Sequence, residues 1–154
     1  MIYVNILIQD LERLNNISQI LINNLQDMRK LITKKSDIHK LEESIKVIDS
    51  LNMDYNNSLQ EVKDLVYSTH YKKLSDIVKA SNSEELRQTY NKTIHLTNQI
   101  HRENREVKAL LDLCQRLNTN HMNLIFGKVQ QPTNYNLDKN NINKHMLNRF
   151  KNTR

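Results

Sequence analysis

The chain has 154 residues, enough for one domain, with 38% hydrophobic residues and a formal net charge of +6. One Gly and one Pro exclude a sheet or a loop-rich fold, because turns need both residues whereas uninterrupted helices exclude them. The single cysteine excludes an intramolecular disulfide and fits a reducing cytosol. No run approaches the roughly 20 apolar residues of a membrane span, and the start lacks the basic region of a signal peptide. We therefore expect an all-α cytoplasmic protein without membrane insertion.

A first helix is predicted over residues 4–33. Apolar residues recur there at alternating spacings of four and three, which is the spacing of a heptad repeat. This first track is Leu7, Leu11, Leu14, Ser18, Leu21, Leu25, Met28 and Ile32. The sequence TKKSD interrupts it at 33–37, where Ser36 or Asp37 could cap the next helix.

A second helix is predicted over residues 37–79. Its track is Ile38, Leu41, Ile45, Ile48, Asn52, Tyr55, Leu59, Val62 and Val66. The pattern fades in YSTHYKK (67–73) and resumes at Leu74 and Ile77, so the continuity of this helix stays open.

A third helix is predicted over residues 83–126. Ser81 followed by Glu84 is the capping-box pattern that precedes a helix, and Gly127 fits the position after its end. The third track is Leu86, Tyr90, Thr93, Thr97, Ile100, Asn104, Val107, Leu111 and Cys114. Thr97 and Asn104 are polar, which raises the question of what this part of the helix faces.

Together the tracks predict an elongated, antiparallel, coiled-coil-like arrangement of three long helices over residues 1–127. Residues 128–154 are Asn- and Lys-rich with few apolar side chains, so we expect a disordered, flexible tail. The body holds 17 basic and 16 acidic residues, whereas the tail holds six basic residues and Asp138. The basic charge therefore belongs to the tail, which lacks an Arg cluster and interleaved aromatics, and no nucleic-acid partner is expected.

No metal, cofactor or catalytic site is expected. His95 and His101 lie on different sides of a helix, and no Cys-x-x-Cys or His-Glu-x-x-His is present. Cys114 falls on an apolar track, where free cysteine usually behaves as a small hydrophobe. A helix interior offers no free backbone N–H groups for an oxyanion hole, and one Gly cannot form a Gly-rich phosphate loop.

The third helix carries the positive signal. At 100° per residue its downstream apolar residues span about 160°, whereas a core-facing stripe needs only somewhat more than about 100°. The arc consists of Val107, Leu110, Leu111, Leu113, Cys114, Leu117, Leu124 and Ile125. Either the extra width contacts both other helices, or part of it stays open for an amphipathic helix of a partner.

The sequences NQIHRENREVKALL, LDLCQRLNTNHMNLIFG and QPTNY, within residues 96–135, resemble the FlgN family of flagellar export chaperones. IHKLEESIKVIDSL (38–51) resembles that family's second helix more weakly. The resemblance implies a cytoplasmic helical chaperone that holds terminal helices of hook–filament junction (hook-associated) proteins and delivers them to the flagellar export apparatus. It places on or beside the client surface Asn104, Val107, Leu110, Leu111, Leu117 and Leu124, and it matches Tyr135 to a tyrosine of the tail. Cys114 is a further candidate for client binding because it belongs to the same apolar arc.

The chain also departs from the family pattern. Family tails usually continue with Gly-x-x-Gly after the tyrosine, where this chain has Asn136 and Lys139, so a turn there is in doubt. We expect a monomer or weak homodimer that acts without catalysis. The alternative is a structural coiled-coil adaptor or tether whose tracks are covered by a second copy in a homodimer.

Overall fold

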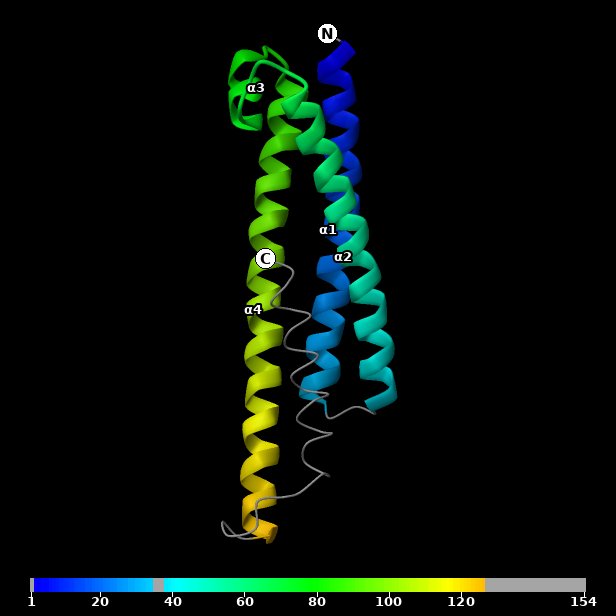
Figure 1. Ribbon diagram of the computed structural model, residues 1–154, viewed down its shortest axis with the longest axis vertical. Helices are drawn as coiled ribbons and strands as arrows, with labels where there is room; N and C mark the ends of the chain where they lie inside the picture. The colour runs from blue at the N-terminus through cyan, green and yellow to red at the C-terminus, as the bar shows by residue number, and fades with distance from the viewer. Residues whose placement is uncertain (1, 35–37, 127–154) are drawn as a thin grey trace.

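The computed structural model describes residues 2–34 and 38–126, and these residues form helices and short connections without any strand. The elements are α1 (Ile2–Thr33), α2 (Ile38–Tyr67), α3 (Leu74–Ala80) and α4 (Glu84–Phe126), shown in Figure 1. The predicted all-α class is thus confirmed for the described part of the chain. No helix within it is both long and apolar enough to cross a membrane. The predicted capping residues Ser36 and Asp37, and the tail, lie outside the described residues.

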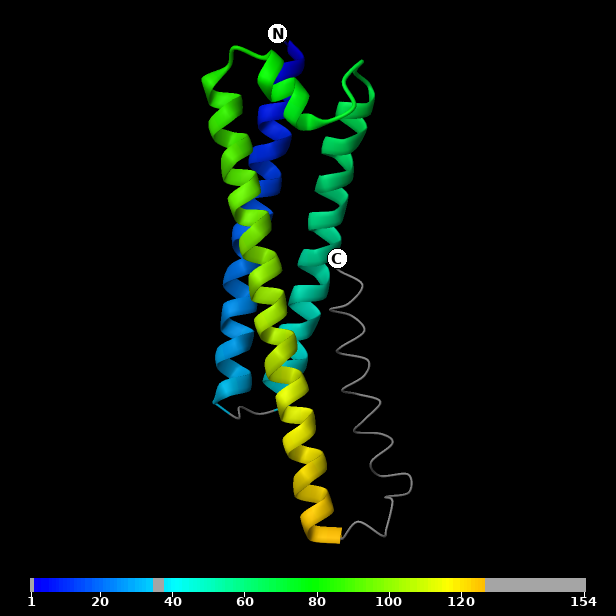
Figure 2. The same cartoon turned by 90° about the vertical axis from the view of Figure 1, so that its left-hand side faces the viewer.

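The three long helices lie side by side, with α3 at one end (Figures 1 and 2). Tyr3 Oη, at the start of α1, donates a hydrogen bond to the carbonyl of Leu65, near the end of α2, at 2.7 Å. These two helices therefore run in opposite directions. Gln26 contacts Glu103, and nearer the start of both helices Asn15 contacts Thr89, so α1 and α4 run in the same direction. Helix α1 contacts both α2 and α4 closely, whereas α2 and α4 approach each other less.

The first track is confirmed as core, because all eight of its residues are buried. Ser18 is accommodated there because its hydroxyl donates to the carbonyl of Leu14 at 2.8 Å. The core has two clusters. One joins the first half of α1 to the end of α2, α3 and the start of α4, and the other joins the second half of α1 to the middle of α2 and α4.

The predicted second helix, 37–79, is interrupted. It ends at Tyr67 and a separate α3 follows. The Thr69 hydroxyl donates to the carbonyl of Val66 at 2.5 Å and accepts from the backbone N–H of Tyr71 at 3.1 Å. Such side-chain bonds compete with the helical hydrogen-bond pattern, which gives a physical reason for the end of α2 in the segment where the track fades.

The predicted capping box at Ser81 and Glu84 is wrong. Ser83 caps α4, because its Oγ accepts a hydrogen bond from the backbone N–H of Leu86 at 3.1 Å. Ser81 Oγ accepts instead from the backbone N–H of Ser83 at 3.1 Å, within the connection. The cap therefore lies two residues later than the sequence pattern predicts, and the helix begins at Glu84 instead of residue 83.

Candidate functional site

The end of α1 divides α4 into two parts. Arg29 of α1 pairs with Glu106 of α4, a separation of 77 residues, and the same separation places Thr33, the last residue of α1, opposite Leu110. Residues 111–126 of α4, which we call the overhang, follow this point; Leu111 and Cys114 at its start still pack against the core, and its remainder extends beyond the α1–α2 hairpin, as Figures 1 and 2 show. At 1.5 Å per residue the overhang is about 24 Å long.

The side of α4 that packs on α1 is an unbroken series spaced by four and three residues. This α1 track of α4 consists of Leu96, Ile100, Glu103, Val107, Leu110, Cys114 and Leu117. Its first four members are buried, Leu110 and Cys114 are half-buried against the core, and Leu117 is 58% exposed. Exposure of the apolar members therefore increases along the track at the point where α1 ends.

This observation corrects alternate positions of the third predicted track, whereas Ile100, Val107 and Cys114 belong to both tracks. The predicted members Thr97 and Asn104 are half-buried, whereas Leu96 and Glu103, one residue earlier, are buried. Thr97 and Asn104 thus occupy the flank of the contact with α1, where a polar side chain still reaches water. This position explains why these two residues can be polar.

The predicted client residues are placed differently by the structure. Val107 is completely buried in the core of the free chain. Leu111 and Cys114 are half-buried against the same core cluster, as is Leu110. Of the residues selected by resemblance, Leu117 is the one plainly exposed apolar side chain within the described residues. The Leu124 side chain and Tyr135 lie outside the described residues.

Leu113 is the apolar residue that selection by resemblance missed. It is 45% exposed and lies four residues before Leu117. The width of the apolar arc indicated it, because Leu113 belongs to the arc although it is not on either track. Together Leu113 and Leu117 give the overhang an open apolar face.

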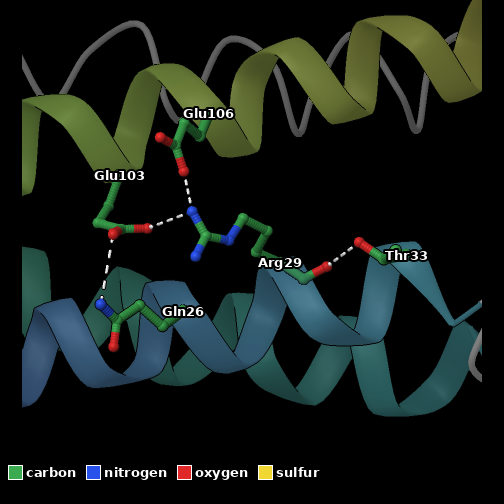
Figure 3. Close-up of polar contacts among 5 residues, drawn as sticks. All are labelled: Gln26, Arg29, Thr33, Glu103 and Glu106. Atoms are coloured by element: carbon green, nitrogen blue, oxygen red, sulfur yellow. Dashed lines mark hydrogen bonds and ion pairs between the residues drawn. The ribbon is translucent and has the colours of Figure 1, made fainter.

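A polar cluster stands just before the overhang (Figure 3). The side chain of Glu103 is only 4% exposed, its Oε2 lies 3.3 Å from Nη1 of Arg29, and its Oε1 accepts from Nε2 of Gln26 at 3.3 Å. Arg29 also pairs with Glu106, and the backbone carbonyl of Arg29 accepts from the hydroxyl of Thr33 at 2.8 Å. Oε2 of Glu103 accepts no well-aligned hydrogen bond from a described residue, so its contact with Arg29 is an ion pair. A buried carboxylate needs such compensation.

The cluster was not predicted from sequence. Its signal was available, because Glu103 falls between Ile100 and Val107 at heptad spacing. A charged residue at such a position is costly unless a partner helix supplies the opposite charge. The partner itself, Arg29, could be identified only from the packing of α1 on α4.

A cavity of about 780 Å³ lies at the opposite end of the molecule, between the start of α1 and the connections around α3. Tyr3, His70 and Tyr71 line it, and none of the described residues that line it is Asp, Glu, Lys or Arg. It therefore has no fixed charge with which to hold a phosphate or carboxylate. Among the described residues no group of His, Cys, Asp and Glu could hold a metal ion.

The exposed leucines of the overhang are thus suited to contact with an apolar surface. The Cys114 thiol packs beside Leu110 and Leu111 against the core, as a small hydrophobe does. Comparison with protein families finds a match over residues 1–142 to the model described as FlgN, FlgN protein. Comparisons with curated proteins and with solved structures find no match.

Proposed function

The chain belongs to the FlgN family of flagellar export chaperones, and from this premise we propose that its overhang binds the terminal amphipathic helices of hook–filament junction proteins. The chaperone would hold these helices in the cytoplasm and deliver them to the export apparatus. Binding without catalysis is sufficient for this role.

The open apolar face of the overhang is the observation that carries the proposal. Singly exposed apolar residues are normal on proteins, but Leu113 and Leu117 extend a face whose residues one turn earlier, Leu110 and Cys114, pack against the core. Covering a leucine side chain contributes about 1.5–3 kcal/mol relative to leaving it in water. A client helix would cover both leucines and shield its own apolar face.

The three long helices provide the rigid support that such a face requires. Leu110, Leu111 and Cys114 are packed against the core, so the near half of the binding face is ordered before a client arrives. The client segment loses conformational freedom on binding, which keeps the affinity moderate and allows release. We propose that the basic tail, net charge +5, assists encounter with the export apparatus.

The proposal is tested with Leu117→Glu and binding to a labelled terminal segment of the organism's own hook–filament junction protein. The variant should lose binding and keep its helical circular-dichroism spectrum, because a charge is introduced where the client would bury a leucine. Ile94→Glu is the matched control, since Ile94 is a 42% exposed apolar residue of α4 well before the overhang. Equal binding by both variants and the natural chain would disprove the proposed surface.

The structural alternative is a homodimer in which the overhang is covered by a second copy. Light scattering separates the two functions. A tight dimer that becomes monomeric with Leu117→Glu and captures no client segment would favour a tether. A monomer, or a weak dimer displaced by the client segment, would support the chaperone.

A further inference from the structure

The α1 track of α4 does not end where α1 ends. Beyond Val107 its spacing continues without a break through Leu110, Cys114 and Leu117, in a single straight helix. Apolar contacts along a heptad repeat do not distinguish a register from one shifted by seven residues, because both align apolar with apolar. Apolar contacts along this track alone would therefore let the α1–α2 hairpin slide along α4 and cover the overhang, with loss of packing in the cluster around α3.

Two buried polar positions oppose such a shift. Asn15 is 3% exposed and its Nδ2 lies 3.4 Å from the carbonyl of Thr89, and Glu103 pairs with Arg29 and Gln26. Buried polar residues in helix seams specify register at a cost in stability. Both positions lie in the contact between α1 and α4, which is the contact that would have to slide.

The shifted arrangement can be described residue by residue. Moving α1 by one heptad toward the end of α4 would place Glu103 beside Gln19 and Ile22, without its arginine. It would also place Arg29 beside Leu110 and Leu113. A carboxylate left buried without a cation is strongly unfavourable, so the observed register is preferred even though it leaves Leu117 exposed.

We infer that the cluster of Gln26, Arg29, Glu103 and Glu106 is a register lock, which keeps α1 from covering the end of the α1 track at Leu110, Cys114 and Leu117. A client helix can then bind to this end of the track, as a continuation of α1. This inference rests on the proposed function for its client. A client helix is the expected occupant because the open end of the track lies on the same side of α4 as the part, Leu96 to Val107, that α1 covers.

The inferred ligand class follows from this geometry. It is an amphipathic helix of about 16 residues, the length of the overhang at equal rise, with apolar residues at alternating spacings of three and four. Its apolar side chains would contact Leu110, Cys114 and Leu117. A segment with a charge at those seam positions should not bind, because the charge would be buried without a partner.

The lock is tested in the full chain with the double variant Arg29→Leu/Glu103→Leu. Both charges of the pair are removed together, so neither remains buried without the other. The matched control is Arg13→Leu/Glu61→Leu, which removes a cross-helix ion pair of 2.9 Å at an exposed site between α1 and α2. The readouts are the rate at which a thiol reagent modifies Cys114, the single cysteine, and the affinity for a labelled terminal segment of the hook–filament junction protein.

If the unlocked hairpin occupies the shifted register about nine times in ten, both readouts should fall about tenfold, because each depends on the fraction of molecules with an open track. The control should match the natural chain, and circular dichroism should show all three folded. An unchanged or faster reaction of Cys114 in the lock variant would overturn the inference.

The two hypotheses fail in different ways. If the natural chain captures no client segment, the proposed function fails while the thiol rate still tests the lock. If client binding depends on Leu117 but Leu110→Glu and Cys114→Glu bind normally, the proposed function stands and binding along the α1 track is disproved. If a second copy, rather than the client segment, protects Cys114, the assigned occupant is wrong.

Discussion

Val107 and Leu117 belong to one apolar track of α4, yet Val107 is completely buried and Leu117 is 58% exposed. The difference arises because α1 ends between them, opposite Leu110. Helix α4 is therefore part of the core before Leu110 and presents an open apolar face after it. The local sequence of α4 does not mark this boundary; the length and register of α1 set it.

Truncating a leucine of the core and a leucine of the overhang should have unequal effects on stability. Leu25→Ala removes a completely buried side chain and should lower the free energy of unfolding by about 2–5 kcal/mol. Leu117→Ala should change it by less than about 0.5 kcal/mol, because the site is largely in water. Urea unfolding followed by circular dichroism measures both. A large loss from Leu117→Ala would place that residue in the core.

Replacing Asn15 by leucine should stabilise the chain. Asn15 is buried and its Oδ1 has no hydrogen-bond partner among the described residues, so Asn15→Leu removes an unsatisfied acceptor. We expect a gain of about 1 kcal/mol in the free energy of unfolding. Asn16→Leu, at the exposed neighbouring residue, is the control and should be nearly neutral. A loss of stability in Asn15→Leu would mean that its Oδ1 is satisfied in solution.

Removing the N-cap of α4 should have a moderate cost. Ser83→Ala deletes the hydroxyl that accepts from the N–H of Leu86 and should lower the free energy of unfolding by about 1 kcal/mol. Ser83→Asp keeps an acceptor there and should retain most of the stability in thermal unfolding. If Ser81→Ala costs more than Ser83→Ala, the cap is assigned to the wrong residue.

Deleting residues 128–154 should separate client binding from export. The deletion removes a net charge of +5 but none of the overhang, so affinity for the client segment should stay within about twofold in a titration at physiological salt. Export of the junction proteins in cells should decrease, because the proposed contact with the export apparatus is lost. Parallel loss of client affinity would assign client recognition to the tail.

Composition and spacing determined the helical class, and spacing determined the eight track residues of α1, although Ile8, Asn15 and Ile22 are buried beside them. Leu7 to Ile32 could be identified because a heptad repeat depends only on the periodicity of the helix that carries it. The width of the apolar arc likewise indicated α4 as the helix with more apolar surface than one contact needs. Near Tyr67 the fading track indicated a weak point in the second helix, but not whether the helix breaks there.

Only the tertiary structure decided which part of that surface is open. The sequence placed Val107 and Leu117 in one arc, and it assigned Thr97 and Asn104 to core positions that the packing of α1 on α4 gives to Leu96 and Glu103. The physical reason is that register between helices depends on pairs distant in sequence. The pairing of Arg29 with Glu103, 74 residues apart, fixes where α1 stops along α4, and no periodicity within either helix contains that information.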